Sequence, residues 1–336
     1  MEGNSVKTFI IAEAGVNHNG SVEIAKKLCL AAKNAGADAV KFQTWITEKV
    51  ITKEVKQADY QITNTGNQQS QFDMLKSLEL GYDQFKNIKA YCDEIGILFS
   101  STADDSEGLD FLVNLGIPFI KIGSSDLGNI SYLRYCGTKK LPIILSTGMG
   151  TLADVEVSVD ALRSGGAQEI TLLHCTTNYP CPFNQVNLNA MKTLGTAFGL
   201  PVGYSDHTKG IEVPIAAVAL GAKVIEKHLT LDRNMEGPDH VASTEPEEFK
   251  KMVSAIRNIE CAMGTGIKKP TNAEVEISKV VLKRIVANHF IPSGKKIEER
   301  DICVKRSTTG LPASAWDVIV GTKARKDFNV DEGIVI

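Results

Sequence analysis

Two hydrophobic patterns alternate along most of the chain. Short apolar runs rich in β-branched residues are typical of parallel strands buried on both faces, and longer stretches with apolar positions at helical spacing predict amphipathic helices. Strands are expected at residues 8–13, 38–43, 97–101, 118–122, 142–147, 169–174, 201–205 and 223–228. Helices are expected between and after them, at residues 21–35, 70–95, 105–115, 129–138, 152–164, 187–198, 210–220 and 245–263. Eight strand–helix units over about 260 residues favour a (β/α)8 TIM barrel, an α/β fold.

The pattern changes after residue 264. Residues 265–279 mix glycine, proline and charged residues, which is typical of an interdomain linker. Residues 280–336 contain the short strand-like runs RIVANH, DICVK and DVIVG, separated by turn sequences. The prediction is therefore a barrel domain over residues 1–264 and a small β-rich domain over residues 280–336. A domain this small has little core of its own and is expected to dock on something larger.

Composition argues against several classes of partner. A formal net charge of -3 gives no electrostatic reason to bind nucleic acid or an anionic membrane. No apolar run approaches the ~20 residues of a membrane-spanning helix, and the N-terminus lacks the layout of a signal peptide. Seven scattered cysteines without a CxxC pair indicate reduced thiols. We expect a cytoplasmic protein whose partners are small molecules or other protein chains.

Polar and ionisable residues occur where the predicted strands end. In a TIM barrel these ends meet at the C-terminal mouth, where the active sites of this fold lie. The strand ends supply Glu13, Lys41, Gln43, Ser101, Thr102, Lys121, Ser124, Ser146, Thr147, His174, Ser205, His207, Glu226 and His228. A structural protein has little use for so many functional groups at one end of a barrel, so the pattern predicts an active site there.

Two pairs within this set point to particular chemistry. His207 and His228 follow neighbouring strands, and although a lone histidine is more often a hydrogen-bonded core residue, a converging pair favours a divalent transition-metal ion. Lys41 and Lys121 need anionic partners if both are buried, because an unpaired buried ammonium is costly. A phosphate or carboxylate ligand would supply that charge. A Schiff-base lysine is the alternative, but two lysines beside several hydroxyl groups favour an anion-binding site.

Seven motifs in order resemble the sialic acid synthases, which condense phosphoenolpyruvate with an N-acylated mannose-type sugar. The motifs are IAEAGVNHNGS (11–21), GADAVKFQT (36–44), ILSTGMG (144–150), LLHCTTNYPCP (172–182), GYSDHT (203–208), IEKHLTLDRNMEGPDHVAS (225–243) and VKRSTTG (304–310). The resemblance runs over the whole chain. It implies a TIM barrel followed by an antifreeze-like (SAF) domain.

The resemblance also implies roles for individual residues. His207 and His228 would bind the metal, with manganese expected first and magnesium or cobalt as alternatives, and Glu13 would act on water at the reaction centre. Phosphoenolpyruvate would be held by Lys41, Thr102, Lys121, Ser124, Ser146 and Ser205. The sugar would contact Gln43, Asn67, Tyr179, Asp239 and Arg306. The family further implies a domain-swapped homodimer, in which the SAF domain covers the active site of the partner and brings the arginine to its N-acyl group.

Three motifs depart from the family pattern. STPFD becomes STADD at residues 101–105, and KIPSGE becomes KIGSSD at residues 121–126, so that Asp126 replaces a glutamate that helps to hold the sugar. KRP becomes KRS, with Ser307 in place of proline. The residues assigned to phosphoenolpyruvate and metal are unchanged, so the departures bear on the acceptor sugar.

The expected product is N-acetylneuraminate, formed with phosphate from N-acetylmannosamine, phosphoenolpyruvate and water. An alternative is N,N'-diacetyllegionaminate, made from 2,4-diacetamido-2,4,6-trideoxymannose, and no sequence feature decides between the two sugars. A non-catalytic binding scaffold is a third interpretation. The complete set of strand-end residues argues against a scaffold, which has no need of them together.

Overall fold

The computed structural model describes residues 7–57, 62 and 70–336 of the chain. Contacts between Cα atoms divide the chain into two compact units, Met1–Thr265 and Gly266–Ile336. No described helix is long and apolar enough to cross a membrane.

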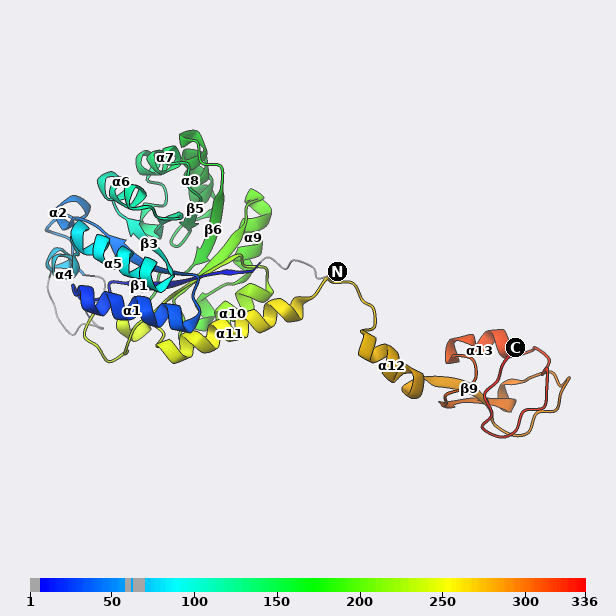
Figure 1. Ribbon diagram of the computed structural model, residues 1–336. Helices are drawn as coiled ribbons and strands as arrows, with labels where there is room; N and C mark the ends of the chain where they lie inside the picture. The colour runs from blue at the N-terminus through cyan, green and yellow to red at the C-terminus, as the bar shows by residue number, and fades with distance from the viewer. Residues whose placement is uncertain (1–6, 58–61, 63–69) are drawn as a thin grey trace. The chain divides into compact units, whose positions relative to one another are not determined.

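The first unit is a closed barrel of eight parallel strands in sequence order, in which β8 pairs back with β1. Figure 1 shows its strands with helices packed around them. The strands are β1 (Phe9–Gly15), β2 (Ala39–Thr44), β3 (Leu98–Ala103), β4 (Ile120–Ile122), β5 (Ile143–Ser146), β6 (Ile170–Cys175), β7 (Val202–Asp206) and β8 (Val224–His228). Every strand begins and ends within two residues of its predicted bounds. The TIM-barrel prediction is confirmed.

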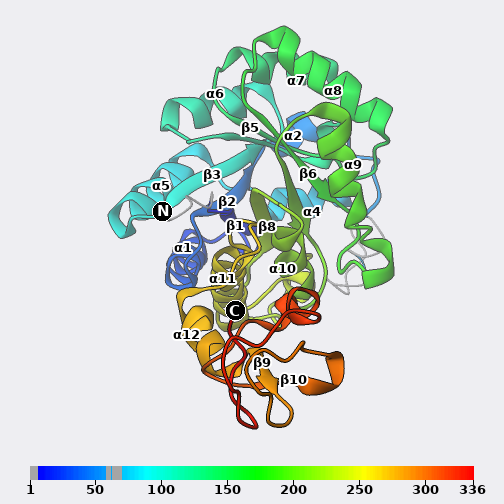
Figure 2. The same cartoon turned by 90° about the vertical axis from the view of Figure 1, so that its right-hand side faces the viewer.

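Helices surround the barrel on its outer face (Figure 2). They are α1 (Val22–Ala35), α2 (Thr47–Val50), α4 (Gln71–Leu78), α5 (Tyr82–Ile95), α6 (Ser106–Leu115), α7 (Ile130–Thr138), α8 (Leu152–Gly165), α9 (Asn189–Phe198), α10 (Glu212–Ala219) and α11 (Pro246–Met263). The single helix predicted over residues 70–95 is wrong, because the chain leaves α4 at Glu79 in an extended conformation and starts again at Gly81, the N-cap of α5.

The alternation of side chains along β8 decides what the barrel mouth contains. Val224 belongs to an apolar cluster inside the barrel, and Glu226 and His228 line the cavity above it. Ile225 belongs to the core between the barrel and its helices. Lys227 is on the same face as Ile225 and pairs there with Asp206 and with the carbonyl oxygen of Thr208. Of the three ionisable residues of β8, Glu226 and His228 therefore face the cavity, and Lys227 faces the layer between the barrel and its helices.

The second unit has a small core of its own. It contains α12 (Asn272–Val281), the antiparallel strands β9 (Lys283–Ala287) and β10 (Ile302–Arg306), and α13 (Trp316–Ile319). Two expectations differ from the structure here. The stretch expected to be linker ends in α12, which a capping box between Thr271 and Glu274 starts, and the run DVIVG, predicted as a strand, lies largely in α13.

Candidate active site

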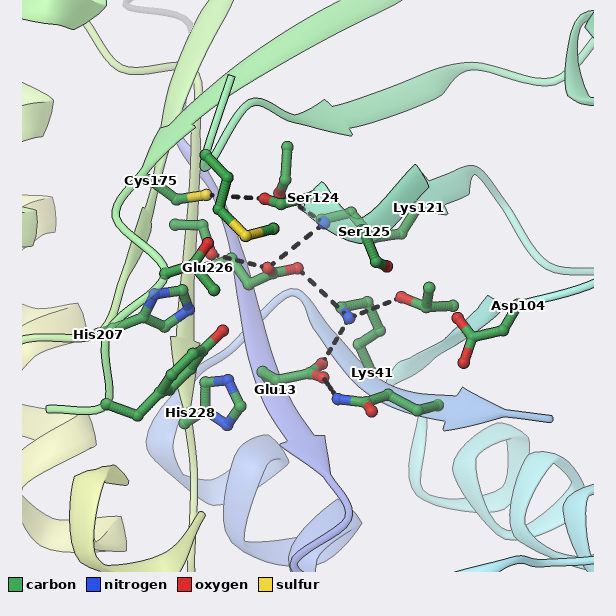
Figure 3. Close-up of a pocket in the computed structure, with 18 residues that line it drawn as sticks. Glu13, Lys41, Asp104, Lys121, Ser124, Ser125, Cys175, His207, Glu226 and His228 are labelled. Carbon is green, nitrogen blue, oxygen red and sulfur yellow. Dashed lines mark hydrogen bonds and ion pairs between the residues drawn. The ribbon is translucent and has the colours of Figure 1, made fainter. Parts of the chain in front are cut away.

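A cavity of about 260 Å³ opens at the carboxyl ends of the barrel strands, and all eight strands contribute to it (Figure 3). Its lining is mostly polar, with several ionisable groups. The residues are Glu13, Lys41, Gln43, Thr102, Asp104, Lys121, Gly123, Ser124, Ser125, Ser146, Met149, Cys175, Thr177, Tyr179, Ser205, His207, Glu226 and His228. This is the end of a TIM barrel at which active sites are found.

Two buried lysines and two buried glutamates form one ionic network in the cavity (Figure 3). Lys41 Nζ lies 2.8 Å from Glu13 Oε2 and 3.6 Å from Glu226 Oε2. Lys121 Nζ lies 3.6 Å from Glu226 Oε1. Both lysines have anionic partners, as burial requires, but the expectation that a ligand supplies the charge needs correction, because the protein itself provides two carboxylates.

Hydroxyl groups complete the surroundings of the lysines. Lys41 donates a hydrogen bond to Thr102 Oγ1 at 2.9 Å, and Lys121 donates one to Ser146 Oγ at 2.8 Å. Ser205 Oγ donates to Glu226 Oε1 at 2.9 Å. The hydroxyls and ammonium groups therefore point into a common space, which suits an anion bound by several donors at once.

Burial and charge act differently on the two glutamates. Burial opposes ionisation of Glu226, but the ammonium groups of Lys121 and Lys41 outweigh it and lower its pKa to about 2. Burial raises the pKa of Glu13 to about 7, even though Lys41 acts in the opposite direction. Burial lowers the pKa of Lys121, whereas Glu13 and Glu226 outweigh the same burial effect at Lys41 and raise its pKa. Of the two glutamates, Glu226 is thus the one that stays ionised at neutral pH.

The two predicted histidines converge, with ring centroids 5.5 Å apart. His207 Nδ1 is 2.8 Å from the carbonyl oxygen of Thr176, which leaves Nε2 for another partner. His228 Nδ1 has no hydrogen-bond partner among the described residues, and Asp239 Oδ2 lies 3.9 Å from it. Burial lowers the pKa of both imidazoles, so both are neutral near pH 7 and hold free lone pairs.

Neutral imidazoles are good ligands for a divalent transition metal. The described part of the chain holds no group of three or more histidine, cysteine, aspartate or glutamate side chains arranged to bind a metal. The histidine pair therefore fits a metal whose remaining positions are taken by substrate or water, and it does not fit a closed structural site.

Most of the predicted site residues meet in the cavity. Those that line it are Glu13, Lys41, Gln43, Thr102, Lys121, Ser124, Ser146, Tyr179, Ser205, His207 and His228. Asp239 is beside His228 and does not belong to the lining. Arg306 is an exposed residue of the second unit, and Asn67 lies outside the described residues.

Sequence reasoning gave no role to several residues of the lining. From sequence, Glu226 is a strand-end carboxylate in the neighbourhood of the histidine pair with no specific role, although its spacing of two from His228 on one strand indicates that both face the cavity. Asp104 follows β3 directly and Ser125 lies in the short turn after β4, and neither has an expected role from sequence. His174, by contrast, was counted at a strand end and turns away, with Nε2 bonded to the carbonyl oxygen of Val186 at 2.7 Å.

Comparison with known proteins agrees with this geometry. The NeuB family model matches residues 28–268. The chain belongs to the NeuB family. It is 44% identical to an N,N'-diacetyllegionaminic acid synthase from Legionella pneumophila, over 99% of this chain and 94% of that protein. It is 47% identical to a protein of the same name from Campylobacter jejuni, over 97% and 98% of the two chains.

A solved structure of a relative shares the fold of this NeuB-family chain. It is the N-acetylneuraminic acid (sialic acid) synthetase from Leptospira borgpetersenii, in complex with citrate. The two superpose with a TM-score of 0.71 at 33% identity, over 84% of this chain and 96% of that chain. The family resemblance seen in the motifs is confirmed.

Proposed function

We propose that this chain condenses phosphoenolpyruvate with an N-acylated amino sugar and water, giving a nine-carbon sugar acid and phosphate. The observation that carries the proposal is the buried network of Lys41, Lys121 and their hydroxyl partners at the barrel mouth of a NeuB-family protein. In the reaction, C3 of phosphoenolpyruvate forms a carbon–carbon bond to the aldehyde carbon of the open-chain sugar. Water adds at C2, and the C2–O bond to phosphate then breaks.

The lysines have a direct task in this scheme. Phosphoenolpyruvate carries a phosphate and a carboxylate, and Lys41, Lys121 and the hydroxyls of Thr102 and Ser146 present donors to such an anion within a buried space. Because the groups are already held in place, they stabilise the charge on the departing phosphate without reorganisation. Glu226, which lies 3.6 Å from both ammonium groups, offsets part of their positive charge before the ligand enters.

Glu13 is proposed to position the water that adds at C2. Its Oε1 atom accepts a hydrogen bond from Gln43 at 3.1 Å, and its Oε2 atom pairs with Lys41, so the carboxylate is fixed between the lysines and the histidines. A carboxylate fixed in this way holds a water in one orientation, which is the first requirement of a general base.

A divalent ion is proposed at His207 and His228, with manganese expected first and magnesium or cobalt as alternatives. When bound, such an ion supplies Lewis-acid polarisation of the aldehyde oxygen. The support is the pair of buried neutral imidazoles, one of which has an Nδ1 atom with no partner among the described residues. Binding of manganese, followed by its electron spin resonance signal, is expected to be lost in a His228→Ala variant.

The acceptor is proposed to be 2,4-diacetamido-2,4,6-trideoxymannose. Support comes from the two relatives named as N,N'-diacetyllegionaminic acid synthases, at 44% and 47% identity. N-Acetylmannosamine, the acceptor expected first from the motifs, is the second candidate, supported by the Leptospira sialic acid synthetase at 33% identity. The ranking of the two sugars is thus the reverse of the expectation from sequence.

The second unit is proposed to be the SAF domain of a domain-swapped homodimer. The support is the position of this small unit after the barrel and the likeness of the chain to its NeuB-family relatives over nearly their whole length. In such a dimer, Arg306 would reach the N-acyl group of the sugar bound in the partner subunit.

Phosphate release from phosphoenolpyruvate tests the reaction and names the acceptor. Both sugars are offered separately with manganese, and a Lys121→Met variant serves as the inactive control. Release with the diacetamido sugar alone supports the proposal, and release with N-acetylmannosamine alone establishes the second candidate. A folded protein that releases phosphate with neither sugar would favour the binding scaffold.

A further inference from the structure

One wall of the cavity is built by the segments that depart from the family pattern. Asp104 follows β3, in the segment STADD, and Gly123 and Ser125 follow β4, in KIGSSD, and all three line the cavity. Figure 3 shows Asp104 on the side of the cavity opposite His207 and His228. The resemblance places an aromatic residue of the family pattern where this chain has Asp104. A carboxyl group therefore faces the cavity at a position where the pattern has none.

Asp104 differs from the neighbouring Asp105 in how its carboxyl group is used. No hydrogen bond or ion pair from the described residues reaches its carboxyl group. Asp105, the next residue, caps α6 by accepting hydrogen bonds from the backbone N–H groups of Glu107 and Gly108. Helix capping is thus already provided, and a capping role does not account for Asp104.

The other carboxylate on this wall does not enter the cavity. Asp126, which stands where the family pattern has a sugar-holding glutamate, accepts a hydrogen bond from Asn129 Nδ2 at 2.9 Å and is absent from the cavity lining. Burial raises the pKa of Asp104 to about 7, and Asp126 raises it further while Lys41 acts in the opposite direction. Asp104 is half-buried in the cavity wall, so its carboxyl group is open to the cavity and can accept a hydrogen bond from a ligand there.

The two substrates differ in what they offer to such a group. Ionised phosphoenolpyruvate has only acceptor oxygens, which would repel a carboxylate. An N-acylated amino sugar carries several O–H and N–H donors. We propose that Asp104 is a specificity-determining residue that accepts a hydrogen bond from an O–H or N–H group of the acceptor sugar. It would do so in place of Asp126, whose carboxylate does not line the cavity. The inference rests on the proposed function.

Kinetics of Asp104 variants test this assignment. In Asp104→Ala, the KM for the acceptor sugar is expected to rise about 10- to 100-fold, because the sugar donor loses its charged partner at the cavity wall. The KM for phosphoenolpyruvate is expected to change less than about twofold. Asp104→Asn, which keeps an acceptor oxygen, is expected to recover part of the loss.

Asp105→Asn is the matched control. It makes the same change one residue away, and asparagine caps a helix as well as aspartate does, so its kinetic constants are expected to match those of the wild type. Circular dichroism melting verifies that each variant is folded.

The possible outcomes separate the two claims. An unchanged acceptor KM in Asp104→Ala would overturn the role of Asp104 while leaving the reaction intact, as would an effect confined to the KM for phosphoenolpyruvate. A loss with either sugar supports the role, and comparison of the two sugars locates the donor, because N-acetylmannosamine has a C6 hydroxyl that the diacetamido sugar lacks. A folded wild-type protein that turns over neither sugar would overturn the proposed function, and the role of Asp104 with it.

Discussion

At the scale of single residues, the site is a balance of buried charges. Lys41 and Lys121 are matched by Glu13 and Glu226, and Glu226 lies 3.6 Å from both ammonium groups. Removing one member of a buried ion pair strongly lowers the stability of the fold, because the remaining charge has neither water nor a partner. The lysines are therefore expected to depend on Glu226 for the stability of the folded barrel.

Glu226→Gln is expected to destabilise the barrel by about 3 kcal/mol, because two buried ammonium groups are then left with Glu13 alone. Urea denaturation followed by circular dichroism measures the change. Inorganic phosphate is expected to restore part of the loss, since it supplies the missing negative charge and binds only the folded protein. Glu156→Gln, at an exposed position of α8, is the control and should change nothing. Equal stability of Glu226→Gln and the wild type would contradict the charge balance.

At the scale of elements, two helices of the outer layer approach each other closely. Figure 2 shows α7 and α8 side by side. A Cβ atom added to Gly137 of α7 would lie 2.3 Å from the carbonyl oxygen of Leu162 and 3.0 Å from Gly165 Cα in α8. Only backbone is present at these contacts, so no side-chain rotation could relieve the clash. The pair of glycines sets the distance between the helices.

Gly137→Ala is expected to destabilise the first unit by about 1–3 kcal/mol, because α7 must move away from α8. Gly195→Ala in α9 is the matched control. Its added Cβ atom would meet Val202 Cγ1 at an ordinary 3.4 Å. The control is expected to be neutral or to stabilise by up to about 1 kcal/mol, since alanine favours the helix. Both variants are compared by urea denaturation, and equal effects would show that the close helix contact has no energetic weight.

At the scale of the whole molecule, the stability of the second unit is expected to depend on a fully buried carboxylate, that of Asp301. Asp301 is fully buried, and its Oδ1 atom pairs with Lys295 Nζ at 2.7 Å and with His289 Nε2 at 2.9 Å. Burial acts to raise the pKa of Asp301, but the bonds from Lys295 and from the backbone of Glu298 outweigh it and lower the pKa. A depressed pKa means that the ionised form stabilises the folded unit.

This contribution is fully present above the unfolded-state pKa of about 3.9, and it is lost as the pH falls through the lower folded-state value. Trp316 packs against the core of this unit, so its fluorescence in a Trp45→Phe background reports unfolding there. Asp301→Asn is expected to lower the urea midpoint at pH 7 and to weaken the acid dependence of that midpoint. Glu299→Gln, at an exposed neighbouring position, is the control. An Asp301→Asn variant with the wild-type acid profile would refute the argument.

The proposed domain swap makes a prediction about mixed subunits. Lys121→Met and Arg306→Ala are each expected to be poorly active alone. If each active site joins the barrel of one chain to the second unit of the other, their heterodimer contains one complete site. Randomly reassembled equal mixtures should then recover about a quarter of the wild-type activity. Recovery should not occur if each site is built within a single chain.

The alternation of strands and helices determined the barrel and the bounds of its strands, because hydrophobic period reports burial along a local segment. Strand ends located most of the cavity lining, since parallel strands deliver their carboxyl ends to one mouth. The hydrophobic period did not reveal the break at Glu79–Gly81, because the helical pattern continues on both sides of it. It also did not show that the apolar run in α13 is helical, because a short apolar run fits a strand or a helix equally well.

Only the tertiary structure decided which charges meet. Lys41 and Lys121 come from separate strands, and they meet Glu13 and Glu226 because closure of the barrel directs side chains of β1, β2, β4 and β8 into one mouth. Asp104 is one of many surface-type aspartates by sequence, and only the turn after β3 directs it into the cavity. The sequence by itself determined most of the elements and the end of the barrel at which the polar cavity opens. Contacts between distant residues determined the charge balance of the site and the wall proposed to recognise the sugar, because these depend on distances and directions that no local pattern contains.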